Sequence, residues 1–229
     1  MQAKSTSPSP QWVVSVEKFS RDDIEKHGNK FLIANGYLGL RGTLEEHGPE
    51  QLAACTISGI YDRNGDKWRE PVNAPFAFGV KVSADGIPCS TLSVEVTRHS
   101  QWVDLTRALH FRQTCLRLDN GNEITLSSER FLSLDDKHLG VLSYTVTASQ
   151  ACELVINTGI DGEIWDINGP HLESFKADSD GETLSLRSVT VESGIPVVVS
   201  ASIQSDSLPP AEKQLTDKAA QHRYRIQAE

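Results

Sequence analysis

Turn signals recur at intervals of roughly ten residues along most of this chain, and residues of alternating polarity lie between them. Four clear signals are Ala84-Asp85-Gly86, Asp119-Asn120-Gly121, Ser179-Asp180-Gly181 and Glu192-Ser193-Gly194. Glycine adopts the left-handed backbone of tight hairpins without steric cost. Because this spacing leaves no room for long helices, it predicts an all-β fold, an antiparallel sandwich of about a dozen strands.

Individual strands follow from the same alternation. Residues 92–97 and 184–191 alternate apolar with polar side chains, so each predicts a strand with one dry and one wet face. The three valines at 197–199 predict a strand covered on both faces. Residues 12–14 predict a short strand that opens the folded part, and 222–227 resume strand alternation near the last residue of the sequence.

One short helix is predicted near the start of the chain. Ser20 is a suitable N-cap, acidic residues follow in the first turn at Asp22 and Asp23, and Gly28 is a suitable end. The polar residues before it predict a disordered leader over 1–11. The remaining residues, 12–229, are predicted to form a single domain, since 38% hydrophobic residues suffice for one core.

Composition excludes several classes of protein. A formal net charge of −9 without a basic cluster argues against nucleic-acid binding. The four widely spaced cysteines form no metal motif; they permit two disulfides, but we favour buried reduced thiols. No apolar run is long enough to span a membrane and no hydrophobic leader is visible, which predicts a cytoplasmic protein.

Residues 35–46 specify local shape more than any other segment. The pair Asn35-Gly36 predicts a tight turn with positive φ at both positions, while Gly39 and Gly42 predict close backbone approaches. Read as a strand, the segment places Tyr37 and Arg41 on one face. An ordinary hairpin in which Arg41 pairs with a nearby carboxylate is the alternative.

Five blocks in order carry a resemblance to a known family. They are residues 35–46, then Ser58-Gly59-Ile60-Tyr61-Asp62, Pro71-Val72-Asn73-Ala74-Pro75, Glu129-Arg130-Phe131-Leu132-Ser133-Leu134 with His138 following, and Ile156-Asn157-Thr158-Gly159-Ile160-Asp161-Gly162. The chain resembles the first domain of glycoside hydrolase family 65, which holds maltose, trehalose and kojibiose phosphorylases and related hydrolases. The resemblance implies a large antiparallel β-sandwich of the galactose mutarotase-like, super-sandwich type, with one or two short helices. It also implies that an (α/α)6 catalytic barrel follows in the parent enzyme and is absent here.

What the family does is carried over as an expectation. The parent enzyme would cleave a glucose disaccharide with inversion, using phosphate or water as nucleophile and a glutamate beyond Glu229 as the acid. The chain alone would then be inactive and serve structure, interface and active-site shape. Expected partners are its own barrel and a second copy in a homodimer, and inorganic phosphate would be a co-substrate without other cofactor or metal. The alternatives are a stand-alone carbohydrate-binding module using Trp12, Trp68, Trp102 and Trp165, and a pure assembly domain.

No residue of this chain is predicted to be catalytic. Glu45 and Glu46 are adjacent, so on a strand they would point to opposite faces and could not flank one bond. Trp165-Asp166 is interpreted as a loop anchor rather than a sugar site. Arg130 and His138 are interpreted as polar groups that fasten a hairpin.

The connection at 61–75 is long, polar and aromatic, and two prolines stiffen it, which is typical of a functional loop. In enzymes of the resembled family, sandwich loops lean towards the mouth of the barrel. The residues predicted to lie near the substrate or against the barrel are therefore Asn35, Tyr37, Arg41, Trp68 and Asn73. An ordinary surface loop is the alternative.

Overall fold

The computed structural model describes residues 10–205 and 208–228 of the chain. Most of the predicted leader, residues 1–9, lies outside the described residues. A 3₁₀ helix, η1 (Pro10–Trp12), is followed directly by β1 (Val13–Val16). Trp12 therefore belongs to a helical turn, and the prediction that it starts the strand is wrong.

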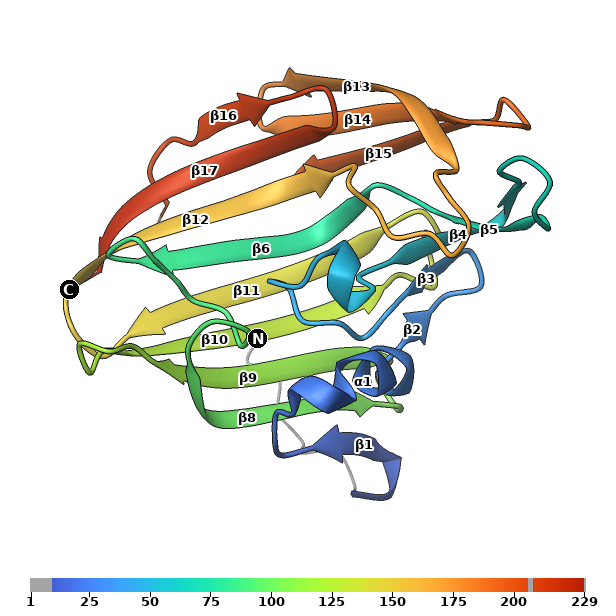
Figure 1. The fold of residues 1–229 in the computed structure, drawn as a ribbon. Coiled ribbons are helices and arrows are strands. Elements are labelled where there is room, and N and C mark those ends of the chain that lie inside the picture. Colours follow the sequence, from blue (N-terminus) through green and yellow to red (C-terminus); the bar gives the residue numbers. More distant parts are fainter. Residues whose placement is uncertain (1–9, 206–207, 229) are drawn as a thin grey trace.

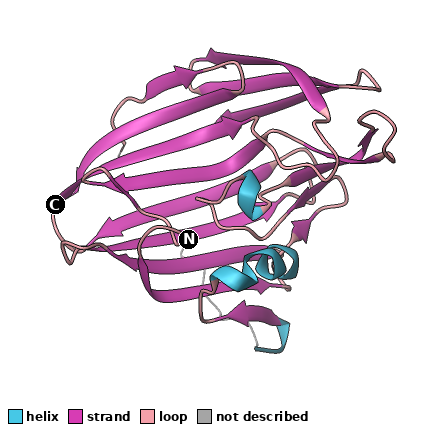
Figure 2. Cartoon of the chain, in the orientation of Figure 1, coloured by secondary structure: helices cyan, strands magenta, loops and turns pink. Residues whose placement is uncertain are grey.

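Strands dominate the described residues, and every strand pair is antiparallel (Figures 1 and 2). One five-stranded sheet, the β8–β11 sheet, has the order β1, β8 (Glu95–Asp104), β9 (Leu109–Arg117), β10 (Glu123–Leu132) and β11 (Gly140–Ala148). The other, the β6–β12 sheet, has the order β16 (Glu212–Leu215), β17 (Ala219–Ala228), β12 (Cys152–Asp161), β6 (Phe76–Ala84) and β7 (Ile87–Pro88). The prediction of an all-β antiparallel fold is confirmed.

Two smaller sheets complete the fold. A three-stranded sheet contains β13 (Leu172–Asp180), β14 (Thr183–Thr190) and β15 (Pro196–Ser202). A four-stranded sheet contains β2 (Ile33–Ala34), β3 (Leu38–Leu40), β4 (Cys55–Asp62) and β5 (Glu70–Asn73). Another 3₁₀ helix, η3 (Pro49–Gln51), lies in the connection between β3 and β4.

Side chains from both five-stranded sheets meet in one apolar cluster. Leu116 and Leu126 come from the β8–β11 sheet, and Val82 and Leu154 come from the β6–β12 sheet. Each of these side chains is at most 5% exposed, so the cluster holds the two sheets together by burial of apolar surface. The four cysteines are buried and free, which confirms the predicted reduced thiols.

The predicted helix is present but differs in its boundaries. A 3₁₀ turn, η2 (Arg21–Asp23), leads into α1 (Ile24–Lys30), and Ser20 makes no side-chain capping bond. Gly28 does not end the helix. It lies where a Cβ would come within 2.6 Å of an Arg41 guanidinium nitrogen, so its missing side chain admits Arg41. No described helix has the length and hydrophobicity needed to cross a bilayer.

Most hairpin predictions are confirmed and two strand predictions are wrong. The glycines of the four turn signals all have positive φ, including Gly86 at 79° and Gly121 at 84°. Residues 92–94 form a turn rather than a strand, because Ser90 accepts hydrogen bonds from the backbone of Ser93 and Val94. The valines at 197–199 do lie in a strand, but Val198 is 54% exposed because one face of the three-stranded sheet is open there. The prediction that this strand is covered on both faces is therefore wrong.

Five connections gather at one end of the sheets, on the right in Figure 1, and we call this the loop end. It comprises residues 35–37, 63–69, 133–139, 162–171 and 191–195. Contacts across large sequence separations join these connections: Asn35 bonds Ser133, Asn64 bonds Gly169, and Asp62 bonds Glu192. The loop end holds Asn35, Tyr37 and Trp68 of the predicted site residues, whereas Arg41 follows β3 and Asn73 ends β5.

Candidate functional site

Asn35 closes the β2–β3 hairpin and fastens it to a neighbouring loop. Its side-chain oxygen accepts hydrogen bonds from the backbone of Tyr37 at 3.0 Å and Leu38 at 2.7 Å. Its amide nitrogen donates to the carbonyl of Ser133 at 2.7 Å. Of the pair, only Gly36 has positive φ, at 87°, so the predicted positive φ at Asn35 is wrong. The side-chain bonds to the backbone close the turn instead.

Tyr37 adds to the contact between the β2–β3 hairpin and the β10–β11 connection. Its ring packs edge-on against His138 at 4.6 Å between centroids, and the Lys137 ammonium lies 5.1 Å from the ring. His138 itself is exposed and lies 3.5 Å from Asp136. It therefore joins the β10–β11 connection to the β2–β3 hairpin, in addition to the local role that the sequence suggested.

Arg41 and Asn73 converge on Trp165. The Arg41 guanidinium donates to the Asn29 side chain at 2.6 Å and lies 6.0 Å from the Trp165 ring. Asn73 is 5% exposed and donates to the Trp165 carbonyl at 2.5 Å. The alternative prediction that Arg41 pairs with a carboxylate is wrong, because its guanidinium donates to the Asn29 amide oxygen and to the backbone carbonyl of Glu25. Burial lowers the pKa of Arg41, against the opposing charge of Glu25.

Trp68 stands apart from the other predicted site residues. It lies in the β4–β5 connection and is 67% exposed. The connection is held at both sides of Trp68, because Arg63 and Arg69 bind the two carboxylate oxygens of Glu192 at 2.9 and 2.7 Å. The tryptophan thus projects from a fixed support.

A buried cluster around His171 lies beneath this connection; we define the His171 cluster as His171, Asp62, Glu70 and Asp166. His171 Nε2 is 2.8 Å from Glu70, and Nδ1 is 3.9 Å from Asp62. Asp166 accepts a hydrogen bond from the backbone N–H of His171 at 3.4 Å. Asp62 ends β4 and Glu70 begins β5, whereas Asp166 and His171 lie in the β12–β13 connection. The cluster therefore joins the β4–β5 connection to the β12–β13 connection. Asp166 acts as the predicted loop anchor.

The carboxylates of this cluster have different proton affinities. Burial raises the pKa of Glu70, but the hydrogen bonds from His171 and Asn168 outweigh it and the pKa is lowered. The pKa of Asp62 is lowered as well, because hydrogen bonds from the backbone N–H groups of Glu192 and Ser193 outweigh the effect of burial. For Asp166 burial prevails, and its pKa rises to about 6 against the opposing effect of His171.

A second buried cluster holds the segment that follows β3; we define the arginine–glutamate network as Glu45, Glu46, Arg112 and Arg130. Arg112 Nη1 lies 2.9 Å from Glu45 and 2.7 Å from Glu46. The prediction that adjacent glutamates point apart is wrong, because residues 45–46 form a turn rather than a strand. Both carboxylates therefore reach one guanidinium.

Arg130 completes this network and fastens residues 41–45. It donates to the carbonyl of Thr43 at 2.7 Å and lies 3.5 Å from Glu45. It therefore fastens residues 41–45 rather than its own hairpin, which corrects the prediction. Burial raises the pKa of Glu46, but the charge of Arg112 outweighs it and the pKa falls to about 2. The pKa of Glu45 is also lowered, since Arg130 and Arg112 together outweigh its burial.

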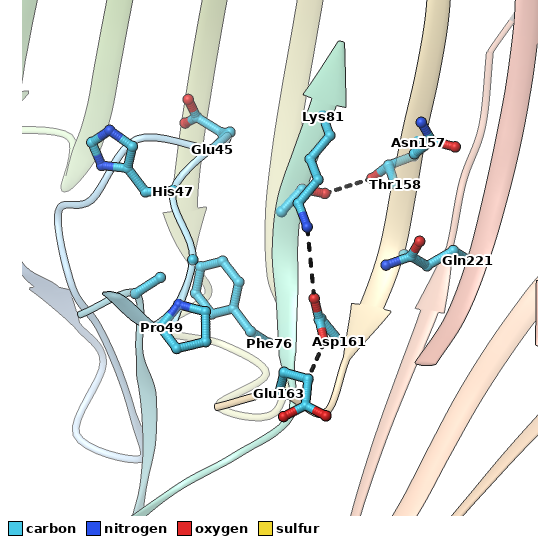
Figure 3. A pocket seen from close by; sticks show the side chains of 14 residues that line it. Glu45, His47, Pro49, Phe76, Lys81, Asn157, Thr158, Asp161, Glu163 and Gln221 are labelled. Atoms are coloured by element: carbon cyan, nitrogen blue, oxygen red, sulfur yellow. Dashed lines mark hydrogen bonds and ion pairs between the residues drawn. The ribbon is translucent and has the colours of Figure 1, made fainter. Parts of the chain in front are cut away.

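The network has no access to a substrate. Glu45 is 1% exposed, and the hollow beside it has a volume of about 30 Å³, close to the space of one water molecule (Figure 3). Lys81 and Asp161, on the neighbouring strands β6 and β12, both line that hollow and lie 4.0 Å apart. In residues 10–205 and 208–228 no group of histidine, cysteine and acidic side chains could hold a metal ion. The carboxylates here are used in ion pairs inside the domain.

The sequence reasoning missed Arg112, His171, Asp62 and Glu70. For Arg112 a signal exists: it shares a strand face with Thr114 and Leu116, so a charged residue lies in the apolar phase of β9. A charge in that phase indicates a buried ion pair. The members of the His171 cluster come from the ends of β4 and β5 and from the β12–β13 connection, and no spacing in the sequence indicates that they meet.

Comparison with known proteins identifies the family. The family model described as "Glycosyl hydrolase family 65, N-terminal domain" matches residues 14–229. The chain belongs to this family. Its fold is that of a putative kojibiose phosphorylase from human microbiome, with a TM-score of 0.83 at 17% identity over 95% of this chain and 30% of the other.

Several curated relatives are phosphorylases. Nigerose phosphorylase from Lachnoclostridium phytofermentans is 42% identical over 72% of this chain and 22% of its own length. The 1,2-alpha-glucosylglycerol phosphorylase from Bacillus selenitireducens is 31% identical over 86% of this chain and 26% of its own length. The family 65 domain described here thus spans about a quarter of the length of these relatives.

Proposed function

We propose that this chain is the N-terminal β-domain of an inverting α-glucoside phosphorylase that acts on a glucose disaccharide, with inorganic phosphate as co-substrate. The match of the family 65 N-terminal model to residues 14–229 carries the proposal, and the phosphorylase names of the relatives support it. In this proposal the chain is inactive alone, and the acid that protonates the leaving oxygen belongs to a catalytic (α/α)6 barrel. The four sheets would then form the super-sandwich of that enzyme, in the cytoplasm.

The loop end is the proposed contact with the barrel. Large apolar side chains are exposed in or beside its connections: Tyr61, Trp68, Leu134, Leu139, Ile167 and Val191. Soluble proteins rarely leave apolar side chains gathered in this way unless a partner covers them. Trp68 is the strongest candidate for an anchor, because exposed aromatic residues on a fixed support dominate interface energetics.

We further propose that Asn35, Tyr37, Arg41 and Asn73 act as positioning residues. Their side chains are used within the domain, on Ser133, His138, Asn29 and Trp165 respectively. They would set the height and orientation of the loop end towards the sugar site. A homodimer is the proposed assembly, and sedimentation of the chain tests that part.

The test uses the complete enzyme that contains this domain. Trp68→Ala should change the ratio of kcat/KM for two acceptors in the synthetic direction by about tenfold, since lost pocket contacts cost about 1–3 kcal/mol. Trp12→Ala, which removes another exposed tryptophan in η1, is the control and should leave the ratio unchanged. An unchanged ratio in Trp68→Ala would remove the loop end from acceptor choice.

A further inference from the structure

The outer face of the β8–β11 sheet carries a groove with a volume of about 650 Å³. Leu116 and Leu126 of this sheet point into the core, so Gln113, three residues before Leu116, and Thr125, one residue before Leu126, point outward. These two side chains form the floor of the groove together with Ser100. The volume is within the range of about 300–1,000 Å³ that is usual for small-molecule sites.

Two irregularities in strand pairing open this groove. The register of β8 against β9 shifts between Val96 and Arg98, which marks a bulge. β1 pairs with β8 only as far as Val16 opposite Gln101, and the chain then leaves the sheet. Residues 17–19 form a wall beside β8, where Phe19 packs edge-on against His99 at 5.7 Å. Bulges of this kind often re-aim side chains next to binding sites.

Thr97 and His99 in the lining of this groove bond the Cys115 carbonyl and the Thr114 hydroxyl, whereas the other polar side chains there make no such contact. Among the described residues, no side-chain hydrogen bond or ion pair occupies Arg98, Ser100, Gln113 or Thr125, nor Glu17 and Lys18 at the rim. Elsewhere on the same sheet Arg117 is paired with Glu123 at 3.0 Å. Unused donors and acceptors thus face the hollow of the surface.

His99 adds a buried polar group beneath this groove. It is 6% exposed, its Nδ1 lies 2.8 Å from the Thr114 hydroxyl, and its Nε2 is buried without a hydrogen-bond partner. Burial, helped by the charge of Arg112, lowers the pKa of His99 to about 4. His99 is therefore neutral at neutral pH, and the charges at the groove are those of Arg98, Lys18 and Glu17.

The composition of the groove points to one chemical class of ligand. Hydroxyl, amide, guanidinium and carboxylate groups together match the donors and acceptors of sugar hydroxyls. The carboxylate of Glu17 disfavours a polyanion. Phe19 lines the groove, and Trp102, on the same strand face as Ser100, stacks on Phe111 at 5.1 Å, so aromatic surface lies next to the polar floor. We propose that this groove binds a short neutral oligosaccharide.

The test is an NMR titration of the chain with maltotriose, cellotriose and glucose 1-phosphate in separate arms. Saturable shifts of the amide signals of residues 17–19, 98–100 and 113 are expected with at least one trisaccharide. Gln113→Ala and Arg98→Ala should each weaken that binding about three- to tenfold, the effect of one lost hydrogen bond. Gln214→Ala and Arg187→Ala, on β16 and β14, remove the same side-chain types elsewhere and should keep the affinity.

Three outcomes would overturn the proposal. The first is linear, unsaturated shifts with both trisaccharides. The second is saturation confined to the loop end, at residues 63–69 and 162–171. The third is a response to glucose 1-phosphate alone, which would make the groove an anion site. None of these outcomes depends on whether the parent enzyme is a phosphorylase.

Discussion

Arg112 is the residue on which the region around residues 35–46 depends most. It is fully buried and neutralises two adjacent carboxylates, while Arg130 holds the backbone just before them. The network contains two acids and two bases, so its charges balance inside the domain. Removal of one base leaves buried charge without compensation, which is among the costlier changes in a protein interior.

Arg112→Met should therefore lower the free energy of unfolding by about 3–5 kcal/mol in urea titration. Arg117→Met, on the same strand but half-exposed, should cost about 1 kcal/mol or less. Equal losses in the two variants would show that Glu45 and Glu46 do not need Arg112.

Gly42 is a second residue with a defined steric role. A Cβ at this position would lie 2.6 Å from the Phe31 carbonyl carbon, and the Gly42 N–H donates to the Gly28 carbonyl at 2.8 Å. Gly42→Ala should lower stability by about 1–3 kcal/mol, since the two backbones must separate. Gly48→Ala, with no atom near the added carbon, is the matched control. Thermal unfolding of the pair distinguishes close approach from a general effect of alanine.

The sequence predicts part of the chemistry at this scale. It indicates that Gly39 and Gly42 mark close approaches, because glycine clusters on a strand have few other causes. It misplaces Glu45 and Glu46, since the period-two argument applies only while the chain is a strand. It also cannot pair Asn73 with Trp165, because nothing in either segment encodes a contact across 92 residues.

At the scale of elements, the His171 cluster determines whether the β4–β5 connection is fixed. Asp62 and Glu70 end and begin its two strands, and both receive hydrogen bonds from loops elsewhere in the chain. Local unfolding should start where such bonds are removed.

His171→Gln should therefore speed trypsin cleavage in the 63–69 connection, which contains Arg63, Lys67 and Arg69. The glutamine removes the imidazole ring that lies between Glu70 and Asp62, so the connection opens more often. His138→Gln, in an exposed position of another loop, should not change the cleavage rate. Mass spectrometry of the early fragments gives the site, and equal rates would contradict the role of the cluster.

Asp166 makes the same element sensitive to pH. Its pKa in the folded state is about 6, above the ordinary value, so between about pH 4 and 6 the folded state holds a proton that the unfolded state has lost. The stabilisation that comes from this bound proton is fully present below the pKa of the unfolded state and is lost as the pH rises through the folded-state pKa of about 6. Asp166→Asn should remove this decline, so the stability difference between variant and parent should grow from pH 4 to pH 6.5. A constant difference across that range would contradict the raised pKa.

Strands and turns are well predicted at this scale, and helix limits are not. Aspartate–glycine and asparagine–glycine turns depend on two residues, which the sequence shows directly, as at Asp85 and Gly86. The helix continues past Gly28 to Lys30. The glycine at 28 makes room for the Arg41 guanidinium instead of ending the helix, and this tertiary contact cannot be read from the local sequence. Residues 92–94 likewise follow hydrogen bonds to Ser90 rather than their own alternation.

At the scale of the whole molecule, the arginine–glutamate network is buried and several of the exposed large apolar side chains lie in or beside the loop end. Glu45, Glu46 and the His171 cluster are all used in holding segments together. Neither hollow described above places a pair of acids on opposite sides of a space large enough for a sugar, since the one beside Glu45 has a volume of about 30 Å³ and the groove on the β8–β11 sheet has Glu17 as its one acidic lining residue. This agrees with the proposal that another part of the enzyme completes the site.

The most direct measurement of this claim is the release of glucose 1-phosphate by the purified chain of 229 residues. Nigerose, kojibiose, maltose and trehalose are each incubated with the chain and phosphate, with the complete enzyme as the positive control. We predict no release above the blank from the chain and release from the complete enzyme. Release by the chain that disappears in Glu45→Gln or Asp166→Asn would contradict the account.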